Sequence, residues 1–172
     1  MAETVYILAG SNLGDRERNL NQAQTRLEAM EGLEITAVSS IYISDAQGMS
    51  EPAAPGFMNQ VLKGDYRFTP NELLQSLEAI ERHLGRTDKG RRLSRPIDLD
   101  ILLFGDQVIA TERLSIPHRS LLERPFAMVP LLQIVPDLVQ PVTGLPIADF
   151  LTDSGRQQVV LYKDYVARSL GA

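Results

Sequence analysis

Two aspartates, Asp98 and Asp100, lie one residue apart within the apolar run from Ile97 to Phe104. Because side chains alternate faces along a strand, the two carboxylates share one face, about 7 Å apart. Such a pair costs free energy through desolvation and mutual repulsion, and a bound divalent cation relieves both penalties. Hard oxygen ligands suit Mg²⁺. A solvated acidic strand end paired with arginines fits the aspartates alone equally well. The apolar residues expected on the opposite face are Ile97, Leu99, Ile101 and Leu103.

Positive charge is concentrated directly before these aspartates. The chain is acidic overall, with a formal net charge of -5, yet six of its 17 Lys and Arg residues lie in this one short stretch. Arginine forks and metal ions neutralise a transferring phosphoryl group, so basic residues beside metal-binding carboxylates predict a triphosphate site. For the basic residues alone, a solvated loop is the alternative. The six residues are Arg82, Arg86, Lys89, Arg91, Arg92 and Arg95.

No glycine-rich phosphate loop accompanies this charge. The turn at residues 10–14 lacks the Gly-Lys-Ser/Thr ending of a P-loop, and no G-x-G-x-x-G occurs, so metal and arginine would hold the phosphates. Phe57 and Asn59 share a strand face, where a ring beside an amide suits a flat heterocycle; taken alone, a core Phe with a structural Asn is the preferred interpretation. His118 is either a phosphate contact or a turn residue, and Glu81 is either a substrate contact or, more simply, a charge at the rim of a helix.

Hydrophobic periodicity and turn residues place these groups on an alternating series of elements. Asp15 is an N-cap candidate, and residues 69–72 combine a capping-box pattern with proline at the first helical position. The order strand, helix, strand, strand, helix, strand predicts an α+β fold, a ferredoxin-like antiparallel sheet with helices packed on it. The expected strands are 5–9, 33–43, 57–66 and 97–104, the expected helices begin after residues 15 and 69, a long loop covers 44–56, a small hairpin covers 108–116, and a short helix covers 126–134.

Composition restricts the class of protein. A chain of 172 residues with 44% hydrophobic composition predicts a single domain, 1–172. The absence of cysteine excludes disulfides and thiolate chemistry, and the acidic balance argues against nucleic-acid binding. No apolar run reaches the roughly 18 residues of a membrane span, and no leader is recognised. We therefore expect a cytoplasmic protein without nucleic-acid or membrane partners, and we take it to be a monomer.

The motifs together resemble the 6-hydroxymethyl-7,8-dihydropterin pyrophosphokinase family. The most specific match is the R-P-I-D-L-D-I-L-L-F block at residues 95–104. Shorter matches follow the order of the family from residue 5 to about residue 140, and they lie at 9–14 (AGSNLG), 57–59 (FMN), 80–81 (IE), 85–86 (GR), 116–118 (IPH) and 124–126 (RPF).

The resemblance implies diphosphate transfer from ATP to 6-hydroxymethyl-7,8-dihydropterin, with AMP as the second product, in folate biosynthesis. It implies that Asp98 and Asp100 hold two Mg²⁺ ions and that Arg86 and Arg95 steady the transferring group. The implied pterin contacts are Phe57, Asn59, Phe126 and Asp98, and the implied ATP contacts are Glu81, Arg86, Arg95, Ile101, His118 and Arg124.

Several departures from the family pattern accompany the resemblance, among them the following. The chain has no Trp, and Arg92 stands roughly where the family often has one; Arg119 replaces a tyrosine frequent after the histidine. A metal-dependent nucleotidyltransferase or cyclase is the rival enzyme class, and turnover of nucleotide alone would reveal it. A non-catalytic small-ligand-binding module of similar fold is the other alternative.

Overall fold

A six-stranded antiparallel sheet forms the centre of the computed structural model, which describes residues 1–45, 56–86 and 94–163. The strands lie in the order β5-β1-β4-β3-β8, and β2 also pairs with β4. Because β5 and β8 lie at the two ends of this order, they are edge strands. The strands are β1 (Glu3–Ser11), β2 (Leu33–Val38), β3 (Ile41–Ser44), β4 (Phe57–Tyr66), β5 (Asp98–Phe104) and β8 (Val160–Lys163).

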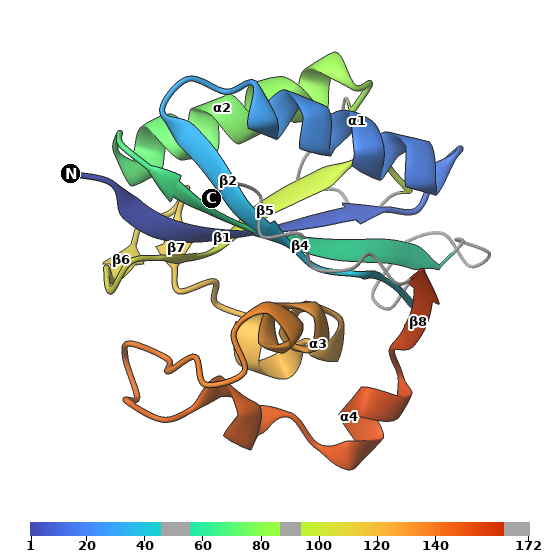
Figure 1. The fold of residues 1–172 in the computed structure, drawn as a ribbon, viewed down its shortest axis with the longest axis vertical. Helices are drawn as coiled ribbons and strands as arrows, with labels where there is room; N and C mark the ends of the chain where they lie inside the picture. Colours follow the sequence, from blue (N-terminus) through green and yellow to red (C-terminus); the bar gives the residue numbers. More distant parts are fainter. Residues whose placement is uncertain (46–55, 87–93, 164–172) are drawn as a thin grey trace.

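Two helices, α1 (Arg16–Glu28) and α2 (Pro70–His83), cover one face of this sheet (Figure 1). The Asp15 side chain accepts the backbone N–H of Arg18 at the start of α1, and Thr69 and Glu72 form a complete capping box at the start of α2. With β2 and β3 taken as one unit, the chain runs strand, helix, strand, strand, helix, strand. The ferredoxin-like α+β prediction is confirmed.

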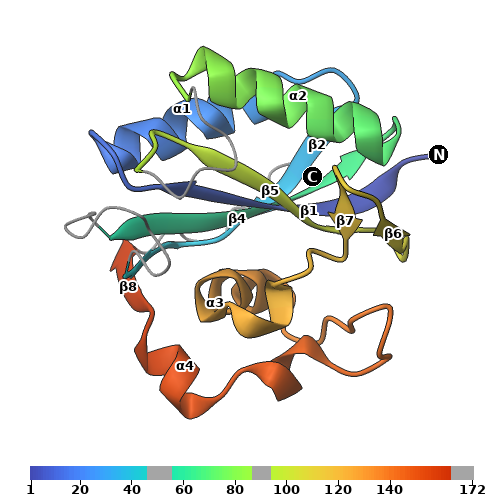
Figure 2. The same ribbon diagram turned by 180° about the vertical axis from the view of Figure 1, so that it is seen from behind.

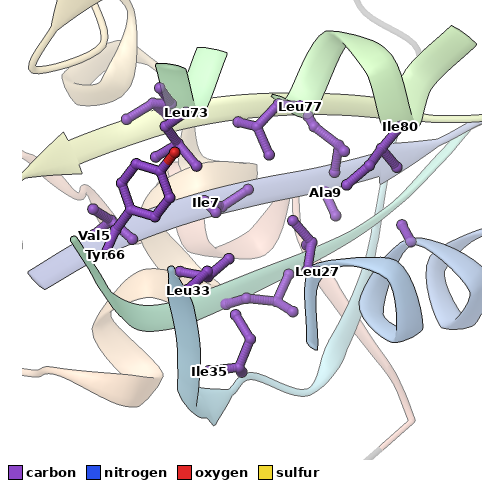
Figure 3. Close-up of a cluster of buried hydrophobic side chains, with 14 of the residues drawn as sticks. Val5, Ile7, Ala9, Leu27, Leu33, Ile35, Tyr66, Leu73, Leu77 and Ile80 are labelled. Carbon is purple, nitrogen blue, oxygen red and sulfur yellow. The ribbon is translucent and has the colours of Figure 1, made fainter. Parts of the chain in front are cut away.

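The residues between the sheet and the two helices form the larger of two hydrophobic cores (Figure 3). Val5, Ile7 and Ala9 of β1 point toward the helices, where they meet Leu27 of α1 and Leu77 of α2. The alternation predicted for a half-buried strand is thus satisfied on this face, and it fixes the register of β1.

The opposite face carries a third helix, α3 (Pro125–Ile134), which sequence reasoning placed along the chain but not in space (Figure 2). Leu8 of β1 and Val61 of β4 pack against α3 residues such as Leu131 in the second core. The remaining elements lie around α3 or beside the sheet: the β6 (Ile109–Ala110) and β7 (Ser115–Ile116) hairpin, the 3-10 turns η1 (Leu121–Glu123) and η2 (Ile147–Phe150), and α4 (Asp153–Gln157).

Two local predictions are wrong. The strand expected over 33–43 is divided into β2 and β3, because Ser39 hydrogen-bonds through both backbone and side chain to Val61: its N–H donates to the Val61 carbonyl and its hydroxyl accepts the Val61 N–H, both at 2.9 Å. Leu103 lies in the second core instead of sharing a face with Leu99, because the β1–β5 register shifts and leaves Leu102 without a partner on β1.

Other expected segments are confirmed or lie outside the described residues. The strand at 57–66, the helix near 126–134 and the small hairpin all form. Much of the expected 44–56 loop, and Lys89, Arg91 and Arg92, fall outside the described residues. The C-terminal part, for which the sequence predicted no element, supplies β8. Among the described residues, no helix combines the length and apolar character required to cross a bilayer.

Candidate active site

A row of paired residues crosses the sheet where β1 ends and β4 and β5 begin. Gly10 is opposite Asn59 on one side and Asp98 on the other. Directly opposed residues in antiparallel strands project their side chains to the same face, so Asp98, Gly10 and Asn59 share the face that α3 covers further along. The predicted metal ligand and the predicted pterin contact are therefore brought to either side of one glycine.

Gly10 leaves room for the ring of Phe57. A Cβ at Gly10 would lie 3.3 Å from Cδ1 of Phe57 and 3.5 Å from Oδ1, the side-chain amide oxygen, of Asn59. Contacts near 3.3 Å are tighter than ordinary van der Waals packing, so a larger residue would displace the ring. The Phe57 ring and the Asn59 amide thus lie close together, as predicted, because Gly10 has no side chain to occupy the space between them.

The Asp98 carboxylate is held by two arginines. Arg86 Nη1 donates to one carboxylate oxygen of Asp98, and Arg95 Nη2 lies 3.5 Å from the other. Arg86 also donates to Glu81 at 3.0 Å. Burial alone lowers the pKa of the Arg86 guanidinium, but Asp98, Glu81 and Asp100 together raise it above its usual value. The predicted group of Arg86, Arg95 and Asp98 is therefore assembled in the folded chain.

Glu81 is not a charge at the rim of a helix, so that interpretation is wrong. Its residue is 1% exposed, and its carboxylate accepts the backbone N–H of Leu99 at 2.9 Å besides the Arg86 contact. A buried carboxylate with these two donors ties α2 to β5 and orients Arg86. A direct contact of Glu81 with nucleotide remains a prediction.

Arg95 is fixed by the turn that follows β1. The buried Asn12 side chain accepts the Arg95 backbone N–H at 2.8 Å, and the Asn12 N–H donates to the Arg95 carbonyl at 3.2 Å. The Arg95 guanidinium carbon lies 5.4 Å from the centre of the Phe57 ring. The Gly10–Gly14 turn, weak as a phosphate motif, thus has a defined role in placing Arg95.

A cleft with a volume of about 380 Å³ runs beside the edge strand β5. Asp100 and Ile101 line it from the strand, and His118 and Arg124 line it from the segment that leads into α3. Four residues predicted to contact metal or ATP therefore share one cavity. Arg119 also lines this cleft.

The His118 ring has a defined tautomer. Its Nδ1 accepts the backbone N–H of Ser120 at 3.1 Å, so in the neutral ring the proton is on Nε2. Burial, and then the positive charge of Arg124, lowers the pKa of His118 to about 4. Near neutral pH, His118 is therefore an uncharged hydrogen-bond donor in a cleft that also contains arginines.

Ser44 lies between Asn59 and Phe126. The amide nitrogen of Asn59 donates to the Ser44 hydroxyl at 2.8 Å and to the Tyr42 carbonyl at 3.3 Å. Ser44 and Phe126 line one small cavity of about 10 Å³. The Arg124 guanidinium carbon lies 5.6 Å from the centre of the Phe126 ring. Phe126 thus connects the amide side of the site with the arginine side.

Arg113 and Ser115 are among the residues of the cleft that sequence reasoning missed. Arg113 is held at the surface by Glu78 of α2, with Nη2 at 3.1 and 3.3 Å from the two carboxylate oxygens. Arg113 and Ser115 lie three residues and one residue before the Ile-Pro-His motif, and that proximity is the one sequence signal that would have indicated them.

The donor set suits magnesium. Asp98 and Asp100 supply hard carboxylate oxygens from one face of β5. Mg²⁺ commonly takes one or two carboxylates and completes its shell with water and phosphate oxygens. The residues present therefore fit the ion that the site chemistry calls for.

Comparison with known proteins identifies the family of this site. The sequence model of the family 7,8-dihydro-6-hydroxymethylpterin-pyrophosphokinase (HPPK) matches residues 6–136 of this chain. The chain belongs to the HPPK family. It is 40% identical over 147 residues to an Aquifex aeolicus 2-amino-4-hydroxy-6-hydroxymethyldihydropteridine pyrophosphokinase, covering 86% of this chain and 89% of that protein. The Bacillus subtilis protein of the same name is 40% identical over 144 residues, covering 84% of this chain and 85% of that protein.

Longer proteins contain an HPPK region as one part. The chain is 37% identical over 160 residues to the folic acid synthesis protein fol1 of Schizosaccharomyces pombe, covering 93% of this chain but 22% of that protein. A solved Plasmodium falciparum HPPK-DHPS with pteroate superposes with a TM-score of 0.67 at 14% identity, over 87% of this chain and 42% of that one. This HPPK-family chain thus spans less than half of these longer relatives, and the solved structure supports the fold alone.

Proposed function

We propose that this protein transfers diphosphate from ATP to 6-hydroxymethyl-7,8-dihydropterin, yielding AMP and the dihydropterin diphosphate for folate synthesis. The observation that carries the proposal is the pairing of Gly10 with both Asp98 and Asn59. With Asp98 on the phosphate side and Asn59 on the pterin side, this pairing would bring the pterin hydroxyl and the nucleotide phosphate close enough for attack. Family membership supports the same reaction.

ATP would occupy the cleft beside β5. His118, as a neutral Nε2–H donor, and Arg124 would bind phosphate oxygens, and Ile101 would contact the nucleotide from the strand. Arg86 and Arg95 would steady the transferring group. Among the described residues, the buried Arg86 Nε–H has no hydrogen-bond acceptor, and a phosphate oxygen would supply one.

The pterin would lie between Phe57 and Phe126. The Asn59 nitrogen is engaged by Ser44 and Tyr42, which leaves its carbonyl oxygen facing the space at Gly10 and able to accept an N–H of the pterin edge. The exocyclic hydroxyl oxygen would then attack the β-phosphorus in line and lose its proton to solvent water. The bond from that phosphorus to the bridging α-oxygen would break with release of AMP.

Asp98 and Asp100 would hold Mg²⁺, two ions by analogy with the implied family chemistry. The metal would neutralise charge on the phosphate oxygens during transfer. Asp98 is already oriented by Arg86 and Arg95, so it would enter this role with its carboxylate in a fixed position. We further propose that residues 1–172 act as one cytoplasmic, monomeric domain on small molecules, with no nucleic-acid or membrane partner.

The decisive experiment separates AMP from ADP. Purified protein is incubated with ATP, Mg²⁺ and 6-hydroxymethyl-7,8-dihydropterin, nucleotides are resolved by chromatography, and the mass of the pterin is followed. AMP formed in step with a diphosphorylated pterin supports the proposal. The matched controls omit the pterin or replace Asp100 with Asn, and neither should form product.

The alternatives give different results in the same assay. Turnover of ATP without pterin would indicate a nucleotidyltransferase or cyclase, and ADP would indicate transfer of a single phosphate. Binding of both substrates without any AMP would leave a ligand-binding module and contradict the proposed reaction.

A further inference from the structure

The first residue of α1, Arg16, reaches across to the strand that bears the Phe57 ring. Arg16 Nη1 donates to the carbonyl oxygen of Gly56 at 2.8 Å. Gly56 directly precedes Phe57, the first residue of β4. A cation in the first turn of a helix is disfavoured by the helix dipole, so the location of this arginine requires a compensating interaction, and the Gly56 carbonyl provides it.

The helix end that bears Arg16 is anchored independently of β4. Asn19 donates to the Leu13 carbonyl at 2.8 Å, which ties the first turn to the segment after β1. Glu17 accepts a hydrogen bond from Lys163 of β8 at 2.7 Å and one from Tyr162 at 3.3 Å. Figures 1 and 2 both show β8 at the same end of the sheet as the start of α1. Because other contacts fix this turn, it can hold the Gly56 carbonyl in place.

The position of the Gly56 peptide determines the position of the Phe57 side chain, because the two residues are adjacent in the chain. Gly56 fits tightly against β3, since a Cβ there would lie 2.7 Å from the Ser44 carbonyl oxygen, and Ser44 is paired with Phe57. The ring of Phe57 then lies against Gly10 and near the Arg95 guanidinium. A small shift of the Gly56 peptide would be passed directly to a ring that already lies close to Gly10.

We infer that Arg16 is a positioning residue for the pterin side of the active site, acting through the Gly56 carbonyl on Phe57. The inference rests on the proposed function, because it takes Phe57 to be a pterin contact. Arg16 would have no part in ATP binding, since its contact lies on the β4 side and it does not line the cleft beside β5.

The test is a comparison of Michaelis constants in three variants of the full chain. Arg16→Gln should raise KM for the dihydropterin about 3- to 10-fold and leave KM for ATP unchanged, because the neutral glutamine amide ends two bonds short of the position of Arg16 Nη1 and does not reach the Gly56 carbonyl. Arg16→Lys should recover part of the pterin affinity, because an ammonium can still donate to Gly56. Arg18→Gln is the matched control, since Arg18 is exposed in the same turn, and it should leave both constants at wild-type values.

Thermal unfolding of each variant accompanies the kinetics. Equal increases in both KM values, or a lower kcat with both KM values unchanged, would contradict a positioning role for pterin, as would unchanged kinetics in Arg16→Gln. These outcomes require an active wild-type enzyme. An inactive wild type would instead refute the proposed function, so the two failures are distinguishable. Calorimetric titration of the dihydropterin with a non-hydrolysable ATP analogue and Mg²⁺ gives the same comparison without turnover, and equal pterin affinity in Arg16→Gln and wild type would also overturn the inference.

Discussion

The two aspartates of β5 have different surroundings although they lie on the same strand face. Asp98 contacts Arg86 and Arg95, and its partner Arg86 is 6% exposed. Asp100 lines the cleft beside β5. Removal of charge at Asp98 would leave a buried guanidinium with one described carboxylate partner, Glu81, whereas removal at Asp100 affects mainly what the cleft can bind.

Asp100→Asn should reduce AMP formation by about 100-fold or more. The neutral amide is a poor metal ligand, and it lacks the negative charge that would attract the cation bound to the phosphates. Asp98→Asn should lose activity and also about 1–3 kcal/mol of unfolding free energy, since Arg86 loses a charged partner. Steady-state AMP production and urea unfolding measure the two effects. Asp106→Asn, in the exposed turn after β5, is the control. Wild-type turnover in Asp100→Asn would refute the metal assignment.

His118 should make the stability of the protein sensitive to acid. Its folded pKa of about 4 lies below its ordinary value of 6.5, so the folded state resists protonation more than the unfolded chain does. The contribution of neutral His118 to the unfolding free energy is therefore fully present above pH 6.5 and is lost as the pH falls toward 4. The expected result is a steeper decline of unfolding free energy across that window in wild type than in His118→Gln.

Urea unfolding at several pH values checks this expectation, and an NMR titration of the ring protons reports the pKa directly. His83→Gln serves as the control, because it removes the other histidine and leaves the buried one in place. Parallel pH profiles for wild type and His118→Gln would contradict the expectation.

At the scale of elements, α2 links local sequence to the site. Its capping box is complete: Glu72 N–H donates to the Thr69 hydroxyl at 3.2 Å, and Thr69 N–H donates to the Glu72 carboxylate at 2.8 Å. The far end of the same helix carries Glu81, which orients Arg86. Helix stability and catalysis can therefore be tested separately at its two ends.

Thr69→Ala should lower the unfolding free energy by about 1 kcal/mol, because the first turn loses a side-chain acceptor. KM for both substrates should stay at wild-type values, since the cap is at the opposite end of α2 from Glu81. Chemical unfolding and steady-state kinetics measure these quantities. Asn71→Ala, an exposed change in the same turn, is the control. A change in either KM without a change in stability would show that the cap acts on the site.

Elements with strong local signals were predictable. The 57–66 strand and the start of α2 were correct because alternation and capping chemistry depend on neighbours in sequence. The division at Ser39 and the reversal of Leu103 were not, because a hydrogen bond to Val61 and a bulge against β1 are contacts between distant segments. The location of α3 on the second face likewise depends on packing, not on its own periodicity.

The candidate site shows the same division. The aspartate pair and the arginines were recognised by residue type and spacing, and the family resemblance then indicated Phe126 and His118. The fixing of Arg95 by Asn12 was not foreseen, because the two residues are 83 positions apart and meet only in the folded chain. The contact of Arg86 with Glu81 is local, and it was not foreseen because Glu81 was interpreted as a charge at the rim of the helix, whereas it is buried. Arg113 was missed because its partner, Glu78, lies on α2.

At the scale of the whole molecule, two cores on opposite faces of one sheet leave the functional residues at an end and an edge. The larger core fixes α1 and α2, and the second fixes α3. Residues of the site come from β1, β4, β5, α2 and the approach to α3, so ligands that bind them join elements from both layers. Binding should therefore be coupled to global unfolding, because a ligand that needs all of these elements binds the folded chain alone.

Mg²⁺, a non-hydrolysable ATP analogue and the dihydropterin, each at about 100 times its Kd, should stabilise the protein by about 2.7 kcal/mol for each ligand that binds only the folded state. For a chain of this size, 2.7 kcal/mol corresponds to an increase in Tm of roughly 5 to 10 °C, which differential scanning calorimetry resolves. Chelation of the metal with EDTA should remove most of the increase due to the nucleotide, and Asp100→Asn should show the same reduced increase with Mg²⁺ present. A Tm increase by the nucleotide that is equal with and without Mg²⁺ would mean that the nucleotide binds without the aspartate pair, and would remove the physical basis for coupling the cleft beside β5 to Asp98 and Asp100.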